Sequence, residues 1–360
     1  MNKSKISVVG LGYIGLPTAA VLASRKIEVI GVDVNEQVVG LINQGKIHIV
    51  EPELDILVNS AVQSGYLRAT MQVEKADVFM VAVPTPFKGD HEPDLSYIQA
   101  AVESIAPVLE KGNLVVLEST LPVGATEKVV GWMRNARPDL QFPVFGKNGG
   151  DTDIAVAHCP ERVLPGHIVR EIVENDRIIG GVTPQCASQA QELYKLFIEA
   201  DCLLTDCRTA ELTKLAENSF RDVNIAFANE LSFICDRHNI DVWGLISMAN
   251  RHPRVNILQP GPGVGGHCIA VDPWFIVDSA PEESKLIATA RNINDSKPEW
   301  VVKKVIEAIH KYNIKEPVIA CLGLSYKPNI DDMRESPSID IVKKLLKENI
   351  HKIVVVEPNI

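Results

Sequence analysis

Several features are absent from this sequence, and each absence narrows its function. No block of Lys and Arg offsets the formal net charge of -10, which argues against nucleic acid or an anionic membrane as the main partner. The polar start has no signal-peptide pattern and no long apolar run follows it, so we expect a cytoplasmic protein. The seven cysteines include no C-x-x-C pair, so we expect neither a disulfide framework nor a metal site.

The length and composition of the chain are sufficient for more than one globular domain. With 360 residues, of which 46% are hydrophobic, the chain is long enough for two or three domains with separate cores. Up to residue 206, amphipathic stretches alternate with short runs rich in β-branched residues: KISVVG, IEVIGVD, DVFMVAVP, NLVVLES, IAVAHCP and CLLT. This alternation predicts an α/β fold in which residues 1–206 form a Rossmann-like, doubly wound parallel sheet.

The second part of the chain is predicted to be mainly helical. Residues 209–238 contain no glycine or proline and many good helix formers, which predicts one long helix bridging two domains or two subunits. Helical patterns continue beyond it, so we assign residues 207–310 to a central helical domain. Residues 311–360 predict strand, helix and strand. Because these leave sheet edges uncovered, we expect only part of a second Rossmann-like domain there.

A glycine-rich turn follows the first predicted strand. The spacing of Gly10, Gly12 and Gly15 permits a tight turn and a close approach of a pyrophosphate to a helix N-terminus. A plain turn would also fit, but Asp33 ends the next strand at the spacing of a carboxylate that binds the adenosine ribose. Its charge would repel the extra phosphate of NADP, so we expect NAD. Thr85 in the VPTP stretch either lines the cofactor cleft or belongs to a simple proline-rich turn.

Three polar residues share one stripe of the long predicted helix. Lys214, Asn218 and Arg221 lie at positions i, i+4 and i+7, so an amine, an amide and a guanidinium face the same way. The stripe is either an ordinary solvated face or a site for an anionic ligand. An acidic protein that binds an anion must gather cations locally, which favours the second interpretation.

The stretch GPGVGGHCIAVDP places a thiol beside several glycines. Glycines allow the backbone to approach a bound group closely, so we expect this loop to wrap around a ligand, with Cys268 as a nucleophile. The alternative is a buried, inert cysteine. Asp272 is either a participant in the chemistry or a cap before Pro273. His267 is adjacent to the thiol, and neighbouring side chains of an extended segment point in opposite directions, so we do not expect it to act as the base.

Seven motifs occur in the order typical of the nucleotide-sugar dehydrogenases: GLGYIGLPTA, VPTP, ESTLPVG, CPERVLPG, KLAENSFRDVNIAFANE, GPGVGGHCIAVDP and GLSYKPNIDDMRESPS. The chain resembles this family over nearly its whole length, and its substrate motifs resemble the UDP-N-acetyl-D-mannosamine branch more than the UDP-glucose branch. The resemblance implies a four-electron oxidation of a sugar alcohol to a carboxylate with NAD. Cys268 would add to the aldehyde carbon, and the thiohemiacetal would become a thioester that water hydrolyses.

The resemblance also implies roles for individual residues. Lys214 matches a residue that transfers protons and stabilises oxyanions, and Asn218 contacts the same oxygen. Water placement and acid-base work fall to Asp272, Thr120 and Glu161. The implied substrate contacts, besides Lys214 and Asn218, are Arg162, Val163, Arg221, His252, Arg254, Gly265, Tyr326 and Lys327. The implied NAD contacts, besides the glycine turn and Asp33, are Tyr13, Ile14, Thr85, Thr126 and Arg334. A homodimer formed through the long helix is expected.

Three alternatives remain open at this stage. A hydroxyacid dehydrogenase of the phosphogluconate kind shares a Lys-x-x-x-Asn pair but performs one oxidation, and it does not need Cys268. UDP-glucose or UDP-N-acetylglucosamine dehydrogenase is a second alternative. A non-catalytic NAD-binding remnant is the third, since the C-terminal domain is expected to be incomplete and to leave the nucleotide cleft open.

Overall fold

The computed structural model describes residues 5–89, 91–147, 152–164, 166–327, 332–348 and 350–358. Parts of two sequence motifs, at 165 and 328–331, lie outside these residues. The chain divides into two compact units. The first unit comprises residues 1–86 and 93–214, and the second comprises residues 87–92 and 215–360. The predicted three-domain division, with its boundary at 310, stays a prediction.

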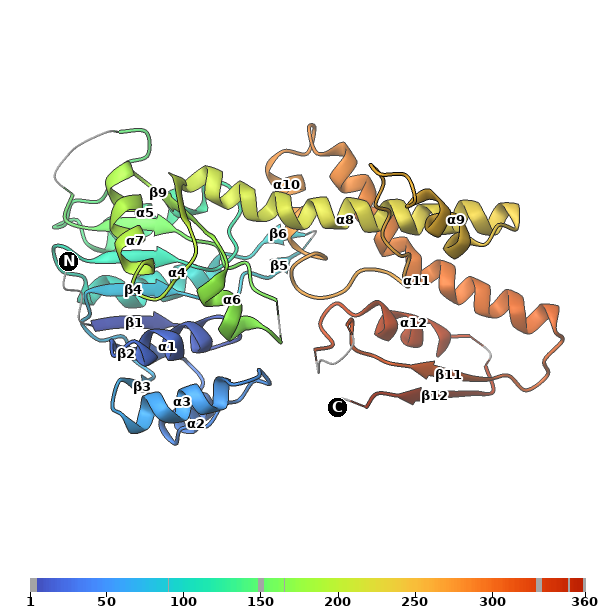
Figure 1. Ribbon diagram of the computed structural model, residues 1–360, viewed down its shortest axis with the longest axis horizontal. Coiled ribbons are helices and arrows are strands. Elements are labelled where there is room, and N and C mark those ends of the chain that lie inside the picture. The colour runs from blue at the N-terminus through green and yellow to red at the C-terminus, as the bar shows by residue number, and fades with distance from the viewer. Residues whose placement is uncertain are drawn as a thin grey trace. The chain divides into compact units, whose positions relative to one another are not determined.

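The first unit is built on an eight-stranded sheet (Figure 1). Its strands are β1 (Lys5–Val9), β2 (Glu28–Val32), β3 (Leu67–Thr70), β4 (Val78–Val81), β7 (Leu114–Leu117), β8 (Ala155–His158), β9 (Arg177–Gly181) and β10 (Cys202–Asp206). The spatial order is β10-β9-β8-β7-β4-β1-β2-β3, so the connections reverse direction between β1 and β4. The predicted α/β fold with a mainly parallel sheet is confirmed.

One pairing departs from the predicted parallel sheet. Ala157 and His158 of β8 pair antiparallel with β9, whereas β9 and β10 run parallel to each other. The sequence pattern also failed to predict two strands, β3 and β9. β3 is a short edge strand that exposes Arg68, and β9 contains Gly180 and Gly181, which weaken a strand signal. A Cβ at Gly181 would lie 2.3 Å from the backbone nitrogen of Ala187, so close helix packing explains that glycine.

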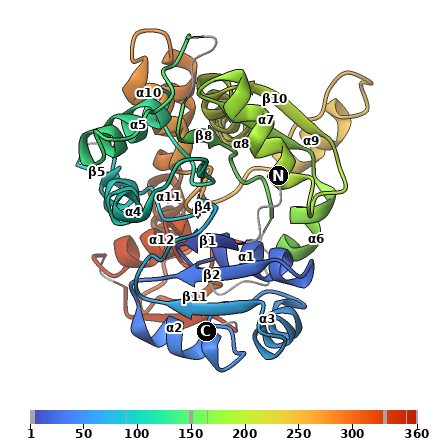
Figure 2. The ribbon, with the colours of Figure 1, turned by 90° about the vertical axis from the view of Figure 1, so that its left-hand side faces the viewer.

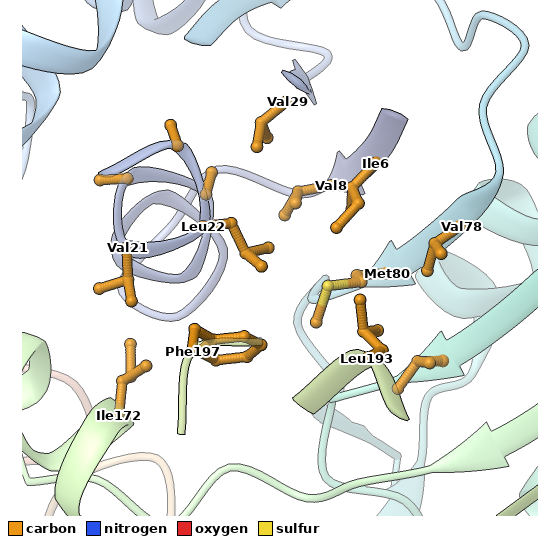
Figure 3. Packing of buried hydrophobic residues seen from close by; sticks show 14 of the residues in the cluster. Ile6, Val8, Val21, Leu22, Val29, Val78, Met80, Ile172, Leu193 and Phe197 are labelled. Atoms are coloured by element: carbon orange, nitrogen blue, oxygen red, sulfur yellow. The ribbon is translucent and has the colours of Figure 1, made fainter. Parts of the chain in front are cut away.

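Helices cover both faces of this sheet. They are α1 (Gly15–Ser24), α2 (Glu36–Asn43), α3 (Leu54–Gln63), α4 (Ser96–Ile105), α5 (Ala125–Ala136), α6 (Ile168–Glu174) and α7 (Pro184–Tyr194), with a short 3-10 turn at Ala106–Val108. Figure 2 shows α4 and α5 on one side and α1, α6 and α7 on the other. Figure 3 shows the second of these layers, where Leu22 and Phe197 pack with Met80 of the sheet. Alternate side chains along the strands thus pack into two apolar cores, one on each face of the sheet.

The second unit is mainly helical. Its helices are α8 (Cys207–His238, which begins in the first unit), α9 (Val242–Ala249), α10 (Asp272–Ser279), α11 (Lys285–Lys311) and α12 (Pro337–Leu345). The strands β11 (Val318–Leu322) and β12 (Lys352–Val356) pair in parallel, and β5 (Phe87–Lys88) pairs with β6 (Glu92–Pro93). The predicted long helix is therefore confirmed, and it begins two residues earlier than predicted, at Cys207 rather than 209.

The described part of the chain contains neither a candidate membrane span nor a candidate metal site. None of its helices combines the length and the apolar composition that are needed to span a bilayer. Its His, Cys, Asp and Glu side chains form no group of three or more that could hold a metal ion. All seven cysteines lie within the described residues, and none of them forms a disulfide.

Candidate active site

The glycine turn lies where the strand order reverses, directly after β1. A Cβ at Gly15 would lie 1.8 Å from the carbonyl oxygen of Gly10, and a Cβ at Gly10 would lie 2.7 Å from that of Ala82. Gly10 also has a φ of +94°. Both positions therefore require glycine for the turn itself, whether or not a ligand is bound. Ligands of doubly wound sheets bind at this edge, outside the carboxyl ends of the strands.

Gly12 differs from the other two glycines of the turn because no atom lies within 4 Å of the position that a Cβ would take there. The missing side chain leaves open space where a pyrophosphate would approach the N-terminus of α1, next to the half-buried Tyr13 and Ile14. Asp33 is held at the end of β2. Its Oδ2 accepts a hydrogen bond from the amide of Leu11 (2.9 Å) and its Oδ1 accepts one from the amide of Asn35 (2.9 Å). These residues fit a dinucleotide.

Two loop residues meet beside this turn. The hydroxyl of Thr85, after β4, donates to the carbonyl oxygen of Thr120, after β7 (2.7 Å). The structure thus brings together one predicted cofactor residue and one predicted catalytic residue. Because β4 and β7 are adjacent parallel strands, their carboxyl ends lie at the same sheet edge as the glycine turn.

Thr126, a predicted NAD contact, is fully buried. Its hydroxyl and its amide both donate to Glu211 Oε1 (2.6 and 2.7 Å), and the amide of Gly124 donates to Glu211 Oε2 (2.7 Å). Glu211 of α8 therefore caps α5, and burial raises the pKa of its carboxyl. Sequence reasoning missed Glu211, since its role depends on a partner 85 residues away along the chain.

Glu161 is buried in a cluster of ionisable groups. Its Oε2 pairs with Arg177 Nη1 (2.5 Å), and both side chains are almost completely buried. Glu118 lies nearby: burial, followed by the charge of Glu161, raises the pKa of the Glu118 carboxyl to about 7. The hydroxyl of Tyr194 donates to Glu118 (2.8 Å). The sequence analysis assigns no role to Arg177, Glu118 or Tyr194.

The predicted substrate residues after Glu161 lie in the same segment. Arg162 is half-buried and donates through Nη1 to the carbonyl oxygen of Asp176 (3.2 Å). Val163 is half-buried and packs against the apolar core of the first unit. Glu51 tethers the end of this segment, because its carboxylate accepts hydrogen bonds from the amides of Gly166 (2.8 Å) and Ile168 (2.7 Å).

In the second unit, Cys268 lies in a turn that leads into α10. Its carbonyl oxygen accepts hydrogen bonds from the amides of Val271 (3.0 Å) and Asp272 (2.8 Å), and its thiol is half-buried. Asp272 is only 2% exposed, and its Oδ2 accepts a hydrogen bond from Asn218 Nδ2 (2.6 Å). The structure thus brings three predicted catalytic residues, Cys268, Asp272 and Asn218, to one place.

The other members of the predicted stripe on α8 differ in exposure. Lys214 lies one turn before Asn218 and is half-buried, whereas Arg221 is exposed. Asn218 itself is 7% exposed. The stripe is therefore not simply a solvated face.

The glycines of the loop contact protein, which corrects part of the sequence interpretation. A Cβ at Gly265 would lie 2.6 Å from that of Tyr326, and one at Gly266 would lie 2.8 Å from the Tyr326 ring. A Cβ at Gly263 would lie 2.8 Å from Pro337. These glycines admit the C-terminal segment against the loop, rather than only wrapping around a ligand. Gly265 and Tyr326, two predicted substrate residues, are thereby in contact.

The remaining predicted residues of this unit lie nearer the surface. Arg334 is exposed and its guanidinium pairs with Asp332 (2.6 Å), while its carbonyl oxygen accepts a hydrogen bond from the amide of Gly266 (3.0 Å). His252 and Arg254 are exposed after α9, and Lys327 is half-buried.

The chain matches one protein family over most of its length. Residues 4–198 match the NAD binding domain of the UDP-glucose/GDP-mannose dehydrogenase family. Residues 208–296 match the central domain of the same family, and residues 320–360 match its UDP binding domain. The three matches follow each other in order along the chain.

Individual relatives are similar over nearly the whole chain. An NDP-N-acetyl-D-galactosaminuronic acid dehydrogenase of Ralstonia nicotianae is 65% identical over 99% of this chain and 83% of its own length. A UDP-N-acetyl-D-mannosamine dehydrogenase of Campylobacter jejuni is 63% identical over 100% of this chain and 88% of its own. The solved UDP-D-ManNAc dehydrogenase of Pyrococcus horikoshii is 42% identical, with a TM-score of 0.91, over 98% of this chain and 83% of its own.

Proposed function

Since the chain belongs to the UDP-glucose/GDP-mannose dehydrogenase family, we propose that it oxidises UDP-N-acetyl-D-mannosamine to the corresponding uronate with NAD. The observation that supports this most is the buried hydrogen bond between Asn218 and Asp272 beside Cys268. A single oxidation of an alcohol does not need a thiol. In a four-electron oxidation without a free aldehyde, a thiol can hold the aldehyde as a covalent adduct that donates the second hydride.

Cys268 is the proposed nucleophile. After the first oxidation, its sulfur adds to the aldehyde carbon and the carbonyl oxygen takes a proton, which gives a thiohemiacetal. Loss of a hydride and a proton then gives a thioester, and water releases the acid and regenerates the thiol. NAD, when bound, supplies the hydride acceptor for both oxidations.

Lys214, Asn218 and Asp272 are the proposed partners of this chemistry. Lys214 transfers the alcohol proton and stabilises the oxyanion, and the amide of Asn218 contacts the same oxygen. Asp272 takes part in acid-base steps, and its hydrogen bond to Asn218 orients that amide. Thr120 and Glu161 are proposed to place the hydrolytic water. The ion pair with Arg177 fixes the Glu161 carboxylate for that purpose.

NAD is proposed to bind at the glycine turn, with its pyrophosphate in the open space at Gly12. Asp33 would accept hydrogen bonds from the ribose hydroxyls, and Tyr13, Ile14 and Thr85 would line the cleft. We retain Thr126 and Arg334 as proposed contacts. Thr126 would act from a buried position in which both its hydroxyl and its amide donate to Glu211. With this cofactor and substrate we propose a cytoplasmic location.

The proposed substrate contacts comprise the positively charged residues that a diphosphate needs, together with the loop residues around them. They are Arg162, Val163, Arg221, His252, Arg254, Gly265, Tyr326 and Lys327, besides Lys214 and Asn218. The contact between Gly265 and Tyr326 supports a substrate site formed by the thiol loop and the C-terminal segment together.

NDP-N-acetyl-D-galactosamine is a second candidate substrate, because the Ralstonia relative is similar over nearly the whole chain. The two sugars differ in the orientation of hydroxyl and acetamido groups and little in size. The test is NADH release by the full chain with UDP-N-acetyl-mannosamine, UDP-N-acetyl-galactosamine, UDP-N-acetyl-glucosamine and UDP-glucose. We expect the highest kcat/KM with the first sugar and poor turnover of UDP-glucose. Comparable turnover of UDP-glucose would contradict the proposed substrate.

A second copy of the chain is the proposed partner of α8. Phe220, Phe227 and Ile234 recur at seven-residue intervals along this helix, and their exposed fractions are 70%, 54% and 46%. Large apolar side chains at this spacing form one stripe, which is typical of a helix that packs against another helix. We expect a homodimer in light scattering. A monomeric Phe227→Glu variant would support this surface, and a Phe227→Glu variant that stays dimeric would contradict it.

A further inference from the structure

A line of buried polar side chains joins α8 to α11. Asp222 Oδ1 of α8 accepts hydrogen bonds from Arg291 Nη1 (2.6 Å) and Asn294 Nδ2 (2.8 Å) of α11. Asn229 Nδ2, two turns further along α8, donates to Asn294 Oδ1 (2.8 Å). All four side chains are almost completely buried. We call these four residues the polar ladder.

The polar ladder reaches the thiol loop at both ends. Asn229 Oδ1 accepts a hydrogen bond from the amide of Gly261, the first residue of the loop (2.9 Å). Arg291 Nη1 contacts the carbonyl oxygen of Ile269, the residue after Cys268 (3.5 Å). The sulfur-bearing residue thus lies between two points that are tied to the same pair of helices.

Stability alone is a poor explanation of this arrangement. Replacing a buried ion pair by well-packed apolar residues is often neutral or stabilising, because both charges lose their hydration. Here burial raises the pKa of the Asp222 carboxyl. Asp222 Oδ2 and Arg291 Nε also have no hydrogen-bond partner among the described residues. The directional bonds therefore stabilise one position of the loop at a cost in folding free energy.

We propose that Asn229 and Arg291 are positioning residues that fix the Cys268 loop between α8 and α11 for attack on the aldehyde carbon. This inference rests on the proposed role of Cys268. It adds residues that do not touch the substrate, and they act through the backbone of the loop. A thiol displaced by about 1 Å would lose much of its rate, since near-attack geometry is narrow.

The test compares Asn229→Leu with Ser232→Ala in the full chain. Leucine keeps a similar volume and removes both hydrogen bonds, including the one to the loop. Ser232 is the matched control: it is a buried polar residue of α8 that accepts a hydrogen bond from Lys297 of α11. Its hydroxyl also donates to the backbone carbonyl oxygen of Asn229 (2.6 Å), so its replacement leaves the side-chain hydrogen bonds of the polar ladder in place. Measurements are kcat, the Kd for NAD, the unfolding midpoint, and the alkylation rate of Cys268 relative to Cys202 in the same molecule.

For Asn229→Leu we expect kcat to fall about tenfold, with an unchanged Kd for NAD. The loosened, half-buried thiol should be alkylated about threefold faster relative to Cys202. Ser232→Ala should lower the unfolding midpoint without changing either readout. A kcat for Asn229→Leu equal to wild type would overturn the proposal, as would equal losses of kcat in both variants.

Arg291→Lys is the second variant, in case Asn229→Leu does not fold. Lysine keeps the charge beside Asp222 but cannot reproduce the guanidinium group, whose Nη1 also contacts Ile269 and whose Nη2 pairs with Asp295. We expect the same faster alkylation and a lower kcat, and normal values of both would overturn the inference. The alkylation readout does not depend on turnover. Failure of covalent catalysis by Cys268 is therefore distinguishable from failure of the positioning role.

Discussion

The two units of this protein place their functional groups by different physical means. The first unit has two extensive apolar layers on a sheet, and its cofactor turn follows from strand ends that these layers fix. The second unit has small apolar clusters, such as Leu215 with Val271 and Phe275, and its helices are also joined by buried hydrogen bonds. Apolar burial tolerates substitution of similar volume, whereas directional polar contacts do not. We therefore expect the second unit to be the more sensitive of the two to substitution.

The largest effect among the variants below is expected at Asp272. Asp272→Ala removes the proposed acid-base group and leaves the buried amide of Asn218 without its partner, so kcat should fall about 10³-fold. The Kd for NAD should not change, because the glycine turn belongs to the other unit. Asp278→Ala, at an exposed position of the same helix, is the control and should keep wild-type kcat. A modest loss for Asp272→Ala would assign this residue to capping alone.

The cofactor turn offers a matched pair of glycine variants. In Gly12→Ala the added methyl group meets no protein atom, so the fold should keep its stability. The methyl group would collide with a pyrophosphate bound at this place, so the variant should bind NAD about 100-fold more weakly. Gly15→Ala collides with the Gly10 carbonyl and should lower both NAD affinity and the unfolding midpoint. Isothermal titration and thermal unfolding separate the two cases. Normal NAD affinity in Gly12→Ala would place the pyrophosphate elsewhere.

Cofactor choice is expected to depend on the charge of Asp33. The wild-type chain should strongly prefer NAD to NADP. Asp33→Asn keeps an acceptor for the amide of Leu11 but removes the repulsion of the 2′-phosphate, so the preference should narrow about tenfold. The measurement is kcat/KM with each cofactor. Equal use of NAD and NADP by the wild type would remove Asp33 from its proposed role.

The smallest effect concerns the buried carboxyl of Glu118. Burial raises its pKa to about 7 in the folded state, above the ordinary value of 4.5. Between these two pH values the folded state holds a proton that the unfolded state releases. The protonated Glu118 carboxyl therefore contributes its full stabilisation of the folded state below pH 4.5, and this contribution is lost as the pH rises through 7.

Glu118→Gln should remove this pH dependence of the unfolding free energy, which amounts to about 3 kcal/mol. Urea unfolding of both proteins at acidic and neutral pH measures the difference. His158, whose pKa burial lowers to about 3, gives the opposite slope in both proteins, so it cancels. Glu103→Gln, at an exposed position of α4, should behave as wild type. A Glu118→Gln slope identical to that of wild type would show that Glu118 ionises normally.

The sequence could predict features that depend on local patterns, but not contacts between residues that lie far apart along the chain. The main strands of the sheet, the turn from Gly10 to Gly15 and the long helix α8 depend on local periodicity and spacing, which one sequence displays. The family resemblance implies that Asn218 and Asp272 are site residues, but the hydrogen bond between them joins positions 54 residues apart. The roles of Glu211, Asp222 and Arg291 come entirely from distant partners, so no local pattern indicates them.

The central claim is that Cys268 forms a covalent intermediate, and Cys268→Ser tests it most directly. The measurement is NADH released per UDP-sugar consumed, with thermal unfolding in the presence of NAD as the control for folding. Wild type should release two NADH per sugar. The serine variant should bind NAD and unfold normally, yet form acid slower by orders of magnitude, because a hydroxyl is a far weaker nucleophile at neutral pH. Near-normal production of the uronic acid by Cys268→Ser would contradict covalent catalysis by this thiol.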